Sequence, residues 1–178
     1  AWGTGGLYGI GMGIAKALAY AGAKIAVNGL NPEHLEKALG DMVEVRSYFD
    51  ANTPDVAETL IEKAVAEGAG IAGCHGGMCD SFRESTEWQF MTGSQWVSHP
   101  GGDQAVYTVK LDKDAPLTCG LEDITLQSEQ YYIHVDPCVK VYATTTFPVA
   151  DGPHATNGEV KVPVVYTKMW GQGRVFYN

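Results

Sequence analysis

The chain has 178 residues, with 21 acidic and 12 basic side chains and a formal net charge of −9. This length suits a single domain with a real hydrophobic core. The acidic balance, without a lysine and arginine cluster, argues against nucleic acid and anionic membrane as partners. No apolar run reaches the roughly 18 residues of a spanning helix, and no signal peptide is visible. We therefore expect a cytoplasmic protein.

The first half of the chain alternates helical and strand patterns. Proline and glycine mark several of the boundaries between them. The expected helices span 11–21, 32–39 and 53–67, and the expected strands span 24–29, 43–51 and 69–75. Because helices and strands alternate, we expect parallel strands with helices on both faces. This predicts a Rossmann- or flavodoxin-like three-layer α/β fold with a parallel sheet.

Strands dominate the second half. Residues 76–105 are rich in glycine, tryptophan and polar groups, which indicates loops with one short helix near 84–92. The expected strands that follow are AVYTVKL, DITLQSEQYYIH, VKVYATTTF, VPVVYTKMW and GRVFYN. We expect them to extend the sheet of a single domain over residues 1–178.

A glycine-rich string, TGGLYGIG at 4–11, opens the first expected helix. Glycines at such a turn let the backbone approach a pyrophosphate, which the helix N-terminus stabilises. With the residues that follow, up to about 70, the string resembles the TGxxxGIG region of short-chain dehydrogenases. That resemblance implies NAD(P) binding by Gly5, Gly9, Gly11 and Asp50. The family's later Tyr-x-x-x-Lys motif is missing, so a glycine-rich turn that binds nothing remains an alternative.

The stretch Gly73-Cys74-His75-Gly76-Gly77 fits the G-x-nucleophile-x-G pattern of a strand–turn–helix elbow. The middle residue of such an elbow occupies a strained turn at the carboxyl end of the sheet. We therefore expect His75 to be the exposed group and Cys74 to point back into the core. The four cysteines lack a zinc-site spacing, and we expect reduced thiols.

From this elbow onward the chain resembles the ThuA-like (trehalose utilisation) family, which has a class I glutamine-amidotransferase-like fold. The matching strings are AGIAGCHGGMCDSFRESTEWQFMTGSQWVSHPGG, SEQYYIHVDP, VYATTTF, PVVYTK and GQGRVFY. The elbow of that superfamily usually carries the amidotransferase cysteine, so histidine at this place implies loss of glutaminase chemistry. The two resemblances meet near residue 70. We therefore expect a Rossmann-like half (1–70) joined to a ThuA-like half (71–178), as in a recombined or engineered chain.

Imidazole and carboxylate groups at one sheet edge could act as acid and base. The candidate catalytic residues are His75, His99, Glu129, His134 and Asp136. The three histidines and Glu129 are equally suitable ligands for a divalent metal. Candidate substrate-binding residues, with aromatic faces suited to sugar rings, are Arg83, Trp96, Tyr131 and Tyr132. Boundary histidines and packed aromatic rings are the structural alternatives.

Three functions therefore stay open. The sequence favours action on a sugar or an oxidised sugar derivative, with His75 central. The alternatives are a fragment of an NAD(P)-binding oxidoreductase and a non-catalytic binding domain or chimera. We expect a small sugar-like ligand as the partner and leave a homo-oligomer, NAD(P) and a divalent metal open.

Overall fold

A computed structural model describes residues 2–3, 26–27, 54–148 and 155–178. The early elements are β1 (Trp2–Gly3), β2 (Ala26–Val27), α3 (Pro54–Ala66), β3 (Ile71–Gly73), α4 (Gly76–Cys79) and α5 (Thr86–Thr92). The later strands are β4 (Ser94–Ser98), β5 (Val106–Leu111), β6 (Ile124–Gln127), β7 (Tyr132–Val135), β8 (Lys140–Phe147), β9 (Val160–Trp170) and β10 (Gly173–Tyr177). The helices expected at 11–21 and 32–39 and the strand expected at 43–51 lie outside the described residues.

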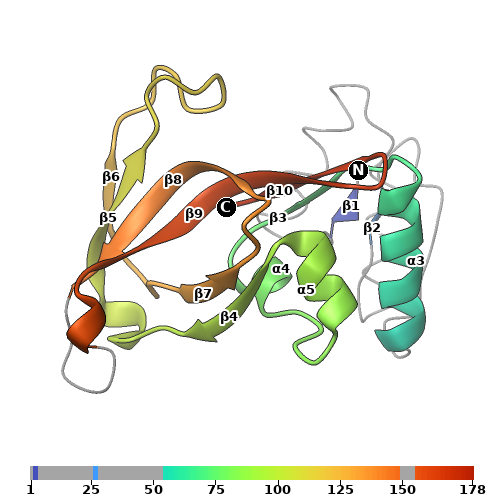
Figure 1. Cartoon of the computed structure of the whole chain (residues 1–178), viewed down its shortest axis with the longest axis horizontal. Coiled ribbons are helices and arrows are strands. Elements are labelled where there is room, and N and C mark those ends of the chain that lie inside the picture. Colours follow the sequence, from blue (N-terminus) through green and yellow to red (C-terminus); the bar gives the residue numbers. More distant parts are fainter. Residues whose placement is uncertain (1, 4–25, 28–53, 149–154) are drawn as a thin grey trace.

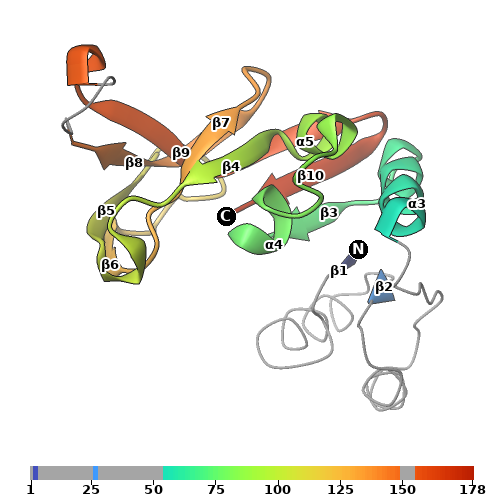
Figure 2. The same cartoon turned by 90° about the horizontal axis from the view of Figure 1, so that it is seen from below.

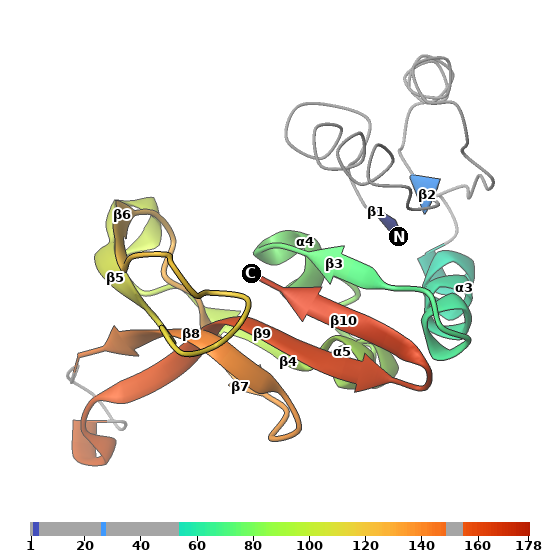
Figure 3. The same cartoon turned by 90° about the horizontal axis from the view of Figure 1, so that it is seen from above.

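The described strands form two sheets (Figure 1). Eight strands lie in the order β2-β1-β3-β10-β9-β8-β5-β6, while β4 and β7 form a separate antiparallel pair. The pairs from β2 to β10 are parallel, whereas β10–β9, β9–β8, β8–β5 and β5–β6 are antiparallel. The large sheet curls between β2 at one end and β6 at the other (Figures 2 and 3).

The predicted Rossmann-like three-layer parallel sheet is therefore wrong. The described part of the chain is mostly β, with a curled mixed sheet and three short helices. The physical reason lies in the connections. Only Gly171 and Gln172 separate β9 from β10, and a parallel pair needs a crossover of a dozen or more residues. The short connections of the second half therefore enforce antiparallel pairing.

The helices α3, α4 and α5 pack on one face of the large sheet, where they share its core. The core residues from the helices and from β3 are Ile61, Val65, Ile71, Met78, Cys79, Trp88 and Met91. Those from the later strands are Ile133, Phe147, Val162, Tyr166, Val175 and Tyr177. Trp88 is 1% exposed, and its indole N–H donates to the Met78 carbonyl at 2.9 Å. This contact fixes α5 against α4.

A buried ion pair joins β9 to the end of β7. Lys168 Nζ lies 2.5 Å from Asp136 Oδ2 and also donates to the Phe90 carbonyl. The two charged side chains are 6% and 12% exposed. The hydrogen bond from Lys168 lowers the pKa of Asp136, which also accepts the Cys138 amide. The pair thus links α5, β7 and β9.

The strand expected over DITLQSEQYYIH is divided between the two sheets. Its first part is β6 and its last part begins β7, and residues 128–131, here called the crossover segment, connect them. The Ser128 amide donates to Ala105 at 3.0 Å. Gln130 is buried, and its side-chain Nε2 donates to Thr145 Oγ1 at 2.7 Å. The crossover segment is thus fixed against β8 and the start of β5.

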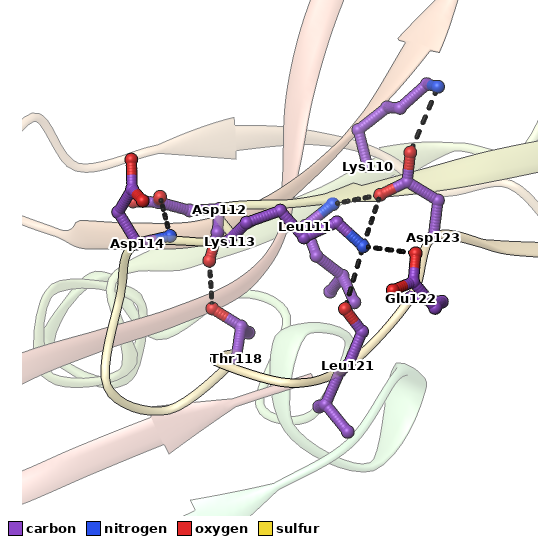
Figure 4. Close-up of polar contacts among 9 residues, drawn as sticks. All are labelled: Lys110, Leu111, Asp112, Lys113, Asp114, Thr118, Leu121, Glu122 and Asp123. Carbon is purple, nitrogen blue, oxygen red and sulfur yellow. Dashed lines mark hydrogen bonds and ion pairs between the residues drawn. The ribbon is translucent and has the colours of Figure 1, made fainter.

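The loop 112–123 between β5 and β6 is held by its own polar groups (Figure 4). Lys113 Nζ donates to the Leu121 carbonyl at 2.7 Å and lies 3.1 Å from Glu122. Asp123 accepts the Leu111 amide at 3.0 Å and pairs with Lys110 at 3.1 Å. The amide bond first, and then Lys110, lowers the pKa of Asp123. These contacts fix the start of β6, from which the crossover segment continues.

Glu62 on α3 lies near two other carboxylates, Glu58 on α3 and Glu87 on α5. Glu62 has a carboxyl oxygen, Oε1, that is buried without a hydrogen-bond partner among the described residues. Burial, followed by the charges of Glu58 and Glu87, raises its pKa to about 7. Glu62 therefore titrates near neutral pH.

Within the described segments, no helix is both long and apolar enough to cross a membrane.

Candidate functional site

The turn between β3 and α4 is strained at its centre, as predicted. His75 has φ 49° and ψ −140°, a backbone conformation that residues other than glycine seldom adopt. Its amide donates to the Asn178 carbonyl at 2.8 Å, and its carbonyl accepts the Cys79 amide at 3.1 Å. The end of β10 and the first turn of α4 together hold this conformation.

Two glycines make room for the turn. A Cβ atom at Gly73 would lie 2.7 Å from Cβ of Met78, so a larger residue would push α4 away from β3. A Cβ atom at Gly76 would lie 3.0 Å from the Tyr131 hydroxyl. The spacing of the G-x-His-G motif therefore has a packing cause at both glycines.

The expected direction of Cys74 is wrong. Cys74 is exposed, and Cys79 on α4 is the buried thiol. β3 ends at Gly73, so Cys74 already belongs to the turn and does not follow the alternation of the strand. Cys79 Sγ lies 3.1 Å from the Tyr177 hydroxyl, and burial raises the pKa of its thiol to about 11. Cys74, Cys79, Cys119 and Cys138 are all free of disulfide bonds.

His75, His99 and Glu129 meet in space although they are far apart in the sequence. Glu129 Oε2 lies 3.8 Å from His75 Nε2, and Glu129 Oε1 lies 3.9 Å from His99 Nε2. His75 comes from the elbow, His99 from the loop after β4, and Glu129 from the crossover segment. His75 Nε2 and His99 Nδ1 are buried without a hydrogen-bond partner among the described residues. One carboxylate therefore faces two imidazoles, and each imidazole has one nitrogen that makes no hydrogen bond within the described residues.

Aromatic rings surround this group. The Tyr131 ring centroid lies 3.7 Å from that of His75 and 5.7 Å from that of His99, with the latter pair stacked. Trp96 lies 5.4 Å from His99 and 6.2 Å from Tyr131. Burial, and then the charge of Glu129, raises the pKa of Tyr131 to about 12. The phenol therefore stays protonated at neutral pH.

The rings of Trp96, Tyr131 and His99 are here called the aromatic wall, and Arg83 lies over its Trp96 ring. Its guanidinium carbon is 4.6 Å from the Trp96 ring centroid. Its Nε and Nη2 donate to the two carboxylate oxygens of Asp80 at 2.7 and 2.8 Å. The expected substrate-binding residues Arg83, Trp96 and Tyr131 thus lie beside the histidines.

Three other predicted site residues lie apart from this group. Tyr132 packs edge-to-face on Phe147, with 5.3 Å between ring centroids. His134 is exposed and lies opposite Gln95 in the β4–β7 ladder, whereas Trp96 lies opposite Ile133. Because side chains alternate along strands, His134 and Trp96 lie on opposite faces. Asp136 is engaged in the ion pair with Lys168.

The sequence reasoning missed Tyr107 on β5. Its hydroxyl donates to the Glu129 carbonyl at 3.2 Å. Burial, and then the charge of Glu129, raises the pKa of this phenol. Tyr107 therefore helps to place the backbone that carries Glu129. The sequence carries no signal for this role because the two residues pair only in the folded chain.

The proposed dinucleotide site cannot be placed. Gly5, Gly9, Gly11 and Asp50 lie outside the described residues, so NAD(P) binding stays a prediction. Within the described ranges, no three histidine, cysteine, aspartate or glutamate side chains are grouped so that they could hold a metal ion.

Comparison with known proteins identifies the family. The model of the ThuA (trehalose utilisation) family matches residues 31–178, and the chain belongs to this family. The match includes the region near residue 70, and the predicted junction with a short-chain dehydrogenase is not supported. No curated protein matches. A β-galactosidase from Rahnella sp. R3 has 14% identity and a TM-score of 0.44, over 86% of this chain and 19% of that enzyme. The chain thus spans about a fifth of that enzyme, and a likeness at this level supports no functional conclusion.

Proposed function

We propose that this chain acts on a sugar or an oxidised sugar derivative, with His75, His99 and Glu129 as its acid and base groups. The main support is the placement of Glu129 between the two imidazoles, 3.8 and 3.9 Å from their Nε2 atoms. The family's trehalose-utilisation description favours a carbohydrate ligand. We also propose that the protein is cytoplasmic and that its binding partner is a small sugar-like molecule.

The chemistry within reach of these residues is proton transfer. An imidazole with a free nitrogen can take a proton from a sugar hydroxyl, or from the carbon beside the carbonyl of an oxidised sugar. Glu129 stabilises the imidazolium that forms. The strained turn holds the His75 ring against Tyr131, so its direction is set before a ligand binds.

The aromatic wall supplies the binding surface. Trp96, Tyr131 and His99 form a cluster of rings in mutual contact. The apolar faces of sugar rings pack on aromatic surfaces, while their hydroxyls bond nearby polar groups. The combination suits a ligand with both characters.

Turnover of trehalose and of a keto derivative of trehalose, followed by NMR, tests this proposal. We expect His75→Ala and Glu129→Gln each to lower kcat/KM about 100-fold or more, as is typical for loss of a general acid or base. His134→Ala tests whether the third predicted histidine participates. Thermal unfolding of each variant controls for misfolding. Equal turnover by wild type and His75→Ala would refute the role of His75, and saturable NADH binding would favour the oxidoreductase alternative.

A further inference from the structure

Arg83 lies over the Trp96 ring and donates two parallel hydrogen bonds to Asp80, an arrangement here called the fork. We propose that Asp80, by occupying this fork, makes the site select neutral sugars against sugar phosphates and sugar acids. This inference rests on the proposed function, because it concerns the ligand of the same site. It assigns Asp80 a role in specificity that the sequence does not indicate.

The first step of the argument is geometry. Arginine grips phosphate and carboxylate groups through two parallel N–H bonds. Here Arg83 Nε and Nη2 already make such a pair of bonds to Asp80, at 2.7 and 2.8 Å. These bonds, and then the charge of Asp80, raise the pKa of Arg83, and an arginine side chain is always positively charged. The fork that would hold an anionic substrate is therefore filled by a carboxylate of the protein itself.

The second step is what the fork leaves free. A guanidinium has five N–H donors, and Asp80 accepts two of them. Arg83 is exposed, with 57% of its side chain accessible. The remaining donors lie in the plane of a group that rests on Trp96. They suit single hydrogen bonds to sugar hydroxyls.

The third step is charge. The described site has two carboxylates, Asp80 beside Arg83 and Glu129 beside the two histidines, and only one guanidinium among its described residues, that of Arg83. Asp80 is near enough to Tyr131 to contribute to its raised pKa, after burial, Glu129 and Cys79. A phosphate or carboxylate on the ligand would meet this negative surplus, and it would have to displace Asp80 to reach Arg83. Neutral sugars avoid both costs.

Titration calorimetry with trehalose and trehalose 6-phosphate tests the inference. We expect wild type to prefer the neutral sugar. Asp80→Asn keeps the shape and frees the fork, and it should raise the affinity for the phosphate about tenfold relative to the neutral sugar. This gain should shrink as salt rises from 0.05 to about 0.5 M, because salt screens exposed charges. Arg83→Gln should weaken trehalose binding without any gain for the phosphate.

A matched control separates local from overall charge. Glu122 lies in the loop 112–123, is almost fully exposed, and Glu122→Gln changes the net charge by the same amount as Asp80→Asn. An equal change of preference in both variants, or none in Asp80→Asn, would overturn the role of Asp80 even if trehalose binding depends on His75. If neither sugar binds wild type, the proposed function fails and this inference fails with it.

Discussion

Because the backbone at His75 is strained, two variants with a small residue at this position should differ in stability. His75→Gly and His75→Ala both remove the imidazole, and with it the contacts to Tyr131 and Glu129. These losses cancel when the two variants are compared. What remains is the backbone, which alanine must hold at φ 49° and ψ −140° and which glycine adopts freely.

The size of the difference can be worked out. A residue held in such a region costs about 1–3 kcal/mol. Glycine in turn destabilises the folded state by about 0.5–1 kcal/mol relative to alanine, because it loses more conformational freedom on folding. We therefore expect His75→Gly to be more stable than His75→Ala by about 1 kcal/mol, and by at most about 2.5 kcal/mol. For a chain of this size, about 1 kcal/mol corresponds to a Tm about 2–4 °C higher.

Urea and thermal unfolding of the two variants measure this difference, and both should be inactive in the sugar assay. The same pair of substitutions at Cys74, whose φ is not positive, should give the opposite order. If His75→Ala equals or exceeds His75→Gly in stability, the turn stores no strain and its proposed role in orienting the ring fails.

Three further predictions concern other contacts. Asp136→Asn should lower the free energy of unfolding by about 3–5 kcal/mol, because it leaves Lys168 charged and buried without its partner. In wild type this contribution should be lost in acid as Asp136 is protonated, and a variant with unchanged urea stability would contradict it. The raised pKa of Glu62 means that the folded state binds the proton more tightly, so stability should fall as pH rises from about 4.5 to 7. Glu62→Gln should remove that slope in Tm against pH. Tyr107→Phe should lower kcat/KM with little change in Tm, because it loses one bond to the Glu129 carbonyl; an unchanged kcat/KM would show that this bond does not position Glu129.

Local sequence patterns predicted the elbow and several elements well. The helix expected near 84–92 is α5, the helix expected at 53–67 contains α3, and the strained residue is His75. These features depend on short-range chemistry, such as capping by Ser85 Oγ, which accepts the Trp88 amide at 3.0 Å. Glycine spacing around His75 likewise reflects contacts within a few residues.

Pairing between strands was not predictable in the same way. Alternation in DITLQSEQYYIH describes a strand but does not reveal that it changes sheets after Gln127. The expected parallel arrangement failed because the pattern of the first half was extended to strands joined by short turns. Which predicted polar residues meet depends on this pairing. Glu129 reaches both histidines, whereas Asp136 pairs with a lysine that is 32 residues away in the sequence.

The crossover segment gives the site an unusual mechanical position. His75 follows β3 of the large sheet, and His99 follows β4 of the small one. Glu129 lies on the crossover segment, which connects β6 of the large sheet to β7 of the small one. A ligand bridging all three groups would act as a clamp between two separately hydrogen-bonded layers. Sugar binding should then slow amide hydrogen exchange in β3 and β4 together. The distances among His75, His99 and Glu129 would also depend on how tightly the two sheets pack.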